Sequence, residues 1–156
     1  MDGALIHNWN ATVSPNDDVY ILGDFTLKDA AGAKHYLSQL VGRKHIIRGN
    51  HDVFLEEVDN WSEHFVWVED YHLLKDTTSG RKLALFHYPI AEWDGFFGDT
   101  IHLYGHVHNS PVSNSRISDD CLAFNVGVDV FDFKPVSIDA IIRLADKKLR
   151  THPKHR

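Results

Sequence analysis

The sequence has little that would cross-link the chain or anchor it in a membrane. Its 156 residues include one cysteine, Cys121, so no internal disulfide can form. No apolar run approaches the roughly 18 residues of a membrane helix, and residues 1–4 lack the positive charge that opens a signal peptide. We therefore expect a cytoplasmic protein with no membrane partner. The length suits one domain over residues 1–156, with a frayed tail at 151–156.

Positive charge is also scarce. There are 16 lysines and arginines against 22 acidic residues, which gives a net charge of −6 with histidine neutral. A broad nucleic-acid groove needs a basic face, so a nucleic-acid partner is disfavoured. A small phosphorylated substrate stays open, because bound metal ions would reverse the local charge.

Hydrophobic periodicity predicts an α/β protein in which strands alternate with helices. A first helix spans residues 4–13, and a second begins at Thr26 and is ended by Gly42. Two further helices are predicted at 54–60 and 137–145. The predicted strands cover residues 19–22, 45–48, 65–68, 71–75, 82–86, 101–104 and 122–126.

Four of these strands end in residues that can bind metal ions. They are followed by Gly23-Asp24, Gly49-Asn50-His51-Asp52, His87, and Gly105-His106-Val107-His108. In layered α/β proteins, functional groups gather in the loops at the carboxyl ends of strands. We therefore expect Asp24, Asn50, His87, His106 and His108 to converge. Carboxylate, amide and imidazole ligands of this kind suit a divalent metal site for phosphate chemistry.

Each motif alone also has a structural interpretation. Gly-Asp after a strand is common, and His87 could be a packed histidine. Two histidines spaced i, i+2 would share one face of a strand, but such pairs also occur in strands by chance. The combination of all the motifs, in this order, is what favours a metal site. Asp52 could orient the ligands of that site through hydrogen bonds, or it could cap a helix. The sequence does not distinguish the two roles.

The order Gly-Asp, Gly-Asn-His-Asp, His, Gly-His-Val-His resembles the signature of the calcineurin-like metallophosphoesterases. Residues 125–130 and 134–137 also resemble the ends of small bacterial and phage members. The resemblance implies two packed mixed β-sheets with helices outside, a four-layer sandwich. It also implies two divalent metal ions (Mn, Fe, Zn or Ni) and hydrolysis of a phosphodiester or a small phosphorylated compound.

The resemblance also implies a role for each matching residue. Asp24 would bridge the two ions, while Asn50, His87 and His106 complete one ion site and His108 serves the other. His51 would contact the phosphate and protonate the leaving oxygen, as a general acid.

The sequence departs from that signature at its start. The signature opens with Asp-x-His at the end of a first strand. This sequence has no Asp-x-His before Asp24 and no predicted strand before its first helix. By comparison with the signature, we expect that a strand and its loop, about 25–30 residues together, are missing before the first helix. We expect one ion site to lack two ligands, and the exposed sheet edge to favour a homo-oligomer or lower stability.

Three further residues are candidates for substrate contact. Arg48 could meet a phosphate, although a salt bridge is the alternative. Trp93 and Phe96 could form a wall on which a ring stacks, or their loop could fold on its own apolar contacts. The sequence thus favours a phosphoesterase, with a catalytically impaired scaffold of the same fold as the competing function.

Overall fold

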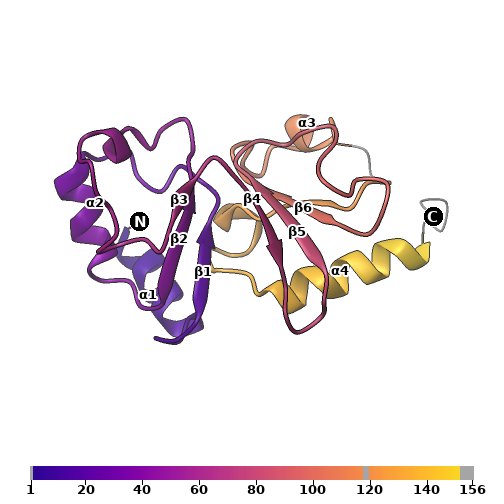
Figure 1. Ribbon diagram of the computed structural model, residues 1–156, viewed down its shortest axis with the longest axis horizontal. Helices are drawn as coiled ribbons and strands as arrows, with labels where there is room; N and C mark the ends of the chain where they lie inside the picture. The colour runs from indigo at the N-terminus through magenta and orange to yellow at the C-terminus, as the bar shows by residue number, and fades with distance from the viewer. Residues whose placement is uncertain (1, 118–119, 152–156) are drawn as a thin grey trace.

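The structure, a computed structural model, describes residues 2–117 and 120–151. It contains two β-sheets with helices outside them, as predicted (Figure 1). Residues 152–156 of the predicted frayed tail lie outside the described residues. No helix among the described residues is long and apolar enough to cross a membrane.

The first sheet has the strand order β1-β2-β3 and is parallel throughout. Its strands are β1 (Asp18–Ile21), β2 (Arg43–Ile47) and β3 (Val68–Glu69). The expectation of two mixed sheets is therefore wrong for this one. The predicted strand at 65–68 is reduced to two residues, because Phe65 turns into the core beneath α2 (Ala30–Leu37).

The second sheet has the order β4-β5-β6-β7 and is mixed. A hairpin pairs β4 (Tyr71–Lys75) antiparallel to β5 (Lys82–Phe86). The strands β6 (Ile101–Tyr104) and β7 (Ala123–Asn125) continue parallel to β5. All four residues of β6 are buried, as expected for a strand covered on both faces.

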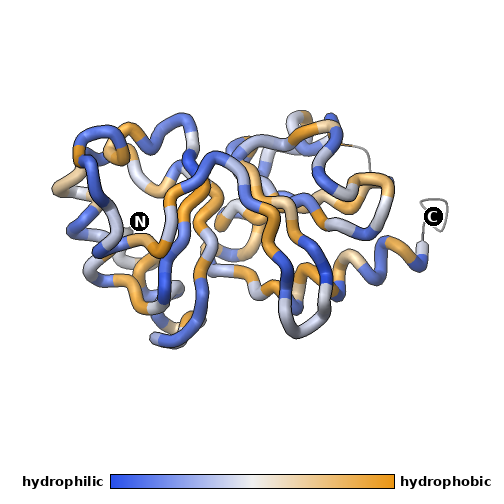
Figure 2. The backbone as a smooth tube through the Cα atoms, viewed as in Figure 1, coloured by the Kyte–Doolittle hydropathy of each residue, from blue (hydrophilic) through white to orange (hydrophobic). Residues whose placement is uncertain are grey.

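Alternating side chains divide the core into layers. Leu83, Leu85 and Leu103 face inward and pack with Ile47 from the first sheet and Ile141 from α4 (Ile138–Thr151). On the outer face of the first sheet, Ile46 packs instead with the apolar side of α2. Hydrophobic segments accordingly lie along the strands, and hydrophilic ones along many of the turns (Figure 2).

The helices differ from the prediction mainly at their ends. The second helix begins at Ala30 rather than Thr26, because the Asp29 side chain accepts the Gly32 N–H and caps it there. The predicted helix at 54–60 is a 3₁₀ turn, η1 (Val53–Glu56), and the last helix extends beyond Ala145 to Thr151. A short helix that the sequence did not predict, α3 (Pro111–Asn114), follows its N-cap residue Ser110.

The first helix, α1 (Asp2–Thr12), is held largely by polar contacts. The Trp9 Nε1 donates to Val41 O at 2.9 Å, and Asn10 exchanges hydrogen bonds with the backbone of Gln39 and Val41. A second 3₁₀ turn, η2 (Val128–Val130), follows β7.

Candidate metal centre

Residues following strands of both sheets meet at one place. Asp24 follows β1, His87 follows β5 and His106 follows β6, and one ligand atom of each lies within 4.8 Å of the other two. Asn50, which follows β2, joins them through Oδ1, 3.0 Å from His87 Nε2. The predicted convergence of these four residues is therefore present.

The orientation of the buried His87 ring determines what this cluster can bind. Its Nδ1 lies 2.7 Å from Leu22 O, a carbonyl that can only accept, so Nδ1 carries the hydrogen. In a neutral ring, Nε2 then presents a lone pair. It faces Asp24 Oδ2 at 3.3 Å and Asn50 Oδ1 at 3.0 Å. With Asn50 oriented in this way, a cation at this point, either a proton on Nε2 or a metal ion, would satisfy all three atoms.

The backbone at the cluster adopts conformations that side-chain-bearing residues rarely take. Asp24, His106 and His108 have φ values of 55°, 63° and 50°. Such conformations cost about 1–3 kcal/mol each and persist where the surrounding structure imposes them. Their occurrence at three predicted ligands marks this edge as a candidate site.

Two glycines allow the loops to approach one another closely. A Cβ on Gly23 would lie 2.4 Å from His87 Nδ1, and one on Gly49 would lie 2.4 Å from Asp24 Oδ1. Gly23 also has a φ of 83°, which disfavours any other residue. These positions explain why glycine precedes Asp24 and Asn50.

Asp52 connects the two loops of the first sheet. Its buried carboxylate accepts the backbone N–H groups of Asp24, Phe25 and Gly49 at 2.7–2.9 Å. Burial raises the pKa of this carboxyl, against the opposing effect of the three hydrogen bonds. It makes no side-chain cap bond to η1, so the structure favours the supporting role over the capping role.

His106 and His51 are exposed members of the same edge. Burial of part of the ring, followed by the neighbouring His87, lowers the pKa of His106. Its ring packs edge-on against His87 and Tyr88, at centroid distances of 5.0 and 4.6 Å. The backbone N–H of His51 donates to Asp24 Oδ1 at 2.9 Å, which places His51 next to the cluster.

His108 is not a member of the close group that Asp24, His87 and His106 form. Its side chain is 80% exposed, and its Nδ1 lies 3.5 Å from Asp129 Oδ2. Asp129 and Asn125 contact this loop but were not identified as site residues from the sequence. They stand in the segment 125–130, whose resemblance to family members was the signal that could have identified them.

The three candidate substrate contacts each have partners within the chain. Arg48 pairs with Asp70 at 3.2 Å, which is the salt-bridge alternative. Trp93 is buried on the outer face of the second sheet, where its Nε1 donates to Thr100 O, and Phe96 packs against it. Both residues thus make apolar contacts within the chain, as in the second of the two interpretations that the sequence left open.

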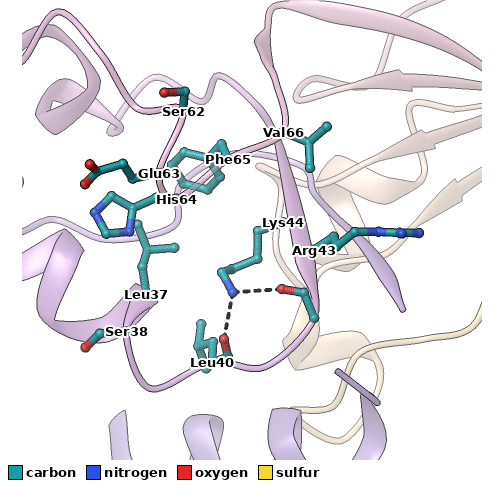
Figure 3. Close-up of a pocket in the computed structure, with 11 residues that line it drawn as sticks. Leu37, Ser38, Leu40, Arg43, Lys44, Ser62, Glu63, His64, Phe65 and Val66 are labelled. Atoms are coloured by element: carbon teal, nitrogen blue, oxygen red, sulfur yellow. Dashed lines mark hydrogen bonds between the residues drawn. The ribbon is translucent and has the colours of Figure 1, made fainter. Parts of the chain in front are cut away.

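A cavity in the first half of the chain does not coincide with the cluster. This cavity of about 430 Å³ opens at the start of β2, between the end of α2 and residues 62–66 (Figure 3). Lys44 in its wall donates to Leu40 O and Gly42 O at 2.7 and 2.9 Å. This lysine satisfies carbonyl groups of the turn after α2, and burial lowers its pKa.

The fold and this cluster define an α/β protein of two sheets with a histidine–aspartate centre where their loops meet. The chain belongs to the family of the uncharacterized protein MJ1445 from Methanocaldococcus jannaschii. The two are 34% identical over 153 residues, which cover 94% of this chain and 76% of that protein. No protein-family model matches the sequence.

A solved structure has the same fold. It is the crystal structure of AQ665 from Aquifex aeolicus, a protein of unknown function. The TM-score is 0.68 at 26% identity, over 92% of this chain and 84% of that one. This likeness supports the two-sheet α/β arrangement.

Proposed function

We propose that this chain is a metal-dependent phosphoesterase of the calcineurin-like class, with the family's four-layer arrangement. It would hydrolyse a phosphodiester or a small phosphorylated compound. The observation that carries the proposal is the convergence of three potential ligand atoms: His87 Nε2 lies 3.3 Å from Asp24 Oδ2 and 3.0 Å from Asn50 Oδ1. His106 completes the group.

The donor set fits a divalent ion such as Mn, Fe, Zn or Ni. Asp24, Asn50, His87 and His106 would hold one ion, and His108 would serve a second that Asp24 bridges. A bound ion supplies an acidified water and neutralises phosphate charge. The hydrogen bond from His87 to Leu22 O fixes which ring nitrogen faces the ion. His51 stands beside Asp24, where it can donate a proton to a leaving oxygen.

Hydrolysis of a chromogenic phosphodiester with added Mn²⁺ tests this proposal. Replacement of His51 by Ala is expected to lower the rate at least about 100-fold, as loss of a general acid does. His35→Ala, an exposed histidine on α2, is the matched control and is expected to keep full activity. Equal rates in wild type and His51→Ala would contradict a phosphoesterase that uses His51.

A scaffold that binds metal without turnover is the second candidate. The exposed His108 ring favours it, because the described residues gather one close ligand group, not two. Calorimetry that shows Mn²⁺ binding, together with assays that show hydrolysis of neither the phosphodiester nor a phosphomonoester, would support this alternative.

A further inference from the structure

The segment Asn125–Asp129 contacts the loop that carries His106 and His108. The Asn125 Nδ2 donates to His108 O at 2.7 Å and to Asn114 Oδ1 at 3.0 Å, while its Oδ1 accepts the Gly127 N–H at 2.9 Å. One side chain thus ties β7 and η2 to the His108 backbone. The phosphoesterase resemblance gives this segment no role.

Asp129 makes the second connection. Its Oδ2 accepts the Asn109 N–H at 2.8 Å and lies 3.5 Å from His108 Nδ1. The carboxylate is only 25% exposed, although the ring it faces is 80% exposed. A carboxylate placed against one nitrogen of an imidazole favours the tautomer with hydrogen on that nitrogen, and leaves the other free to bind.

Gly127 makes room for this arrangement. A Cβ there would lie 2.8 Å from Asp129 Oδ1 and 3.1 Å from Asn125 Oδ1. Its φ of −51° and ψ of 138° are open to any residue, so the restriction comes from those two side chains rather than from the backbone. An alanine would push one of them away from the loop.

We propose that Asp129 is a positioning residue that holds His108 with hydrogen on Nδ1 and Nε2 free to bind a cation, in a bracket completed by Asn125 and Gly127. The strained φ of 50° at His108 is then maintained from two sides, by Asn125 on its carbonyl and by Asp129 on the following N–H. This role of Asp129 deepens the proposed function and rests on it, because the cation would be the catalytic metal ion of the phosphoesterase. The tautomer itself is independent of any metal.

Long-range ¹H–¹⁵N NMR of the metal-free, full chain measures the tautomer directly. Wild-type His108 is expected to show hydrogen on Nδ1. Asp129→Ala is expected to convert it mainly to the Nε2–H form, and Gly127→Ala to shift it the same way. Asp129→Asn, which can keep an oxygen at the same place, is expected to retain the wild-type form in part.

Asp59→Ala is the matched control, because Asp59 is also acidic and is exposed. This substitution is expected to leave the His108 signals unchanged. Titration with Mn²⁺ adds a second readout. Asp129→Ala is expected to weaken binding of the ion that His108 holds by about 10–100-fold. Binding of the ion held by Asn50, His87 and His106 is expected to change less, because Asp129 contacts none of these three residues in the structure.

Unchanged His108 signals in both Asp129→Ala and Gly127→Ala would overturn the proposal. The outcome is separate from the fate of the proposed function. A wild-type chain that binds no Mn²⁺ but shows the Asp129-dependent tautomer would contradict the proposed phosphoesterase function. The same result would support the positioning role of Asp129.

Discussion

At the scale of single residues, Asp52 does most to hold the candidate site together. Three backbone amides from two loops converge on its buried carboxylate. Each would lose its acceptor if the side chain were removed, and an unsatisfied buried donor costs about 1–3 kcal/mol. The loops that carry Asp24 and Asn50 therefore depend on this one carboxylate.

Asp52→Ala is expected to lower the free energy of unfolding by about 3 kcal/mol, because partial relaxation would satisfy some of the three donors. Asp52→Asn should cost less, since one oxygen remains. Urea unfolding followed by circular dichroism measures both, with exposed Asp59→Ala as the reference. An Asp52→Ala chain as stable as the reference would show that the three hydrogen bonds contribute nothing net.

Single residues also show which parts of the site the sequence motifs could predict. Asp24, Asn50, His87 and His106 were predicted from glycine-flanked motifs at strand ends, and the structure brings all four together. Trp93 could not be placed in this way. An aromatic residue close in sequence to a ligand is equally able to cover a sheet face, and only the fold determines which surface it meets.

At the scale of elements, the parallel pair β1 and β2 is joined at its start by a charged contact. Asp18 receives two hydrogen bonds from Arg43, at 2.9 and 2.6 Å, and lies 2.9 Å from His45 Nε2. The bond from Arg43 is the largest cause that lowers the pKa of Asp18 in the folded chain. Folding therefore favours the ionised form of this carboxyl.

Asp18→Asn tests that contact through its pH dependence. Because the folded pKa lies below the unfolded value of about 3.9, the stabilisation is present above that pH and is lost as the pH falls through the folded value. We expect the free energy of unfolding of the variant at pH 7 to be lower than that of the wild type by less than about 1 kcal/mol, as for other exposed salt bridges. The difference should shrink as the pH falls below about 3.9.

Thermal unfolding at pH 7 and near pH 2 would show this change. The surface substitution Asp59→Asn carries the same change of charge and is expected to have no such pH dependence. A gap between wild type and Asp18→Asn that is equal at both pH values would rule out an ionic contribution.

At the scale of the whole molecule, the candidate site joins the two sheets. Asp24 and Asn50 follow strands of the first sheet, and His87 and His106 follow strands of the second. A cation held by all four would bind the folded chain and not the unfolded one. At a concentration 100 times its Kd it would stabilise the fold by about 2.7 kcal/mol.

Addition of Mn²⁺ is therefore expected to raise the Tm, and a chelator should reverse the rise. His87→Ala should abolish the response, because it removes the buried ligand, while His35→Ala should retain it. A Tm that Mn²⁺ leaves unchanged in the wild type would count against cation binding at this site.

The sheet edges lead to a prediction about assembly. Among the described strands, β1 pairs only with β2, and β7 only with β6. An unpaired strand edge can add a strand from another chain. We expect light scattering to show a homodimer at high concentration that dissociates on dilution, and a stable monomer throughout would contradict a role for these edges.

The sequence by itself determined where most of the strands lie and which potential ligands follow them. The strands 82–86 and 101–104 and the positions of Asp24, His87 and His106 depend on local pattern, which survives without knowledge of distant contacts. Tertiary structure alone decided that Phe65 leaves its predicted strand, that Trp93 covers a sheet, and that Asp129 faces His108. Those outcomes depend on which distant side chains share a space, and local periodicity carries no information about that.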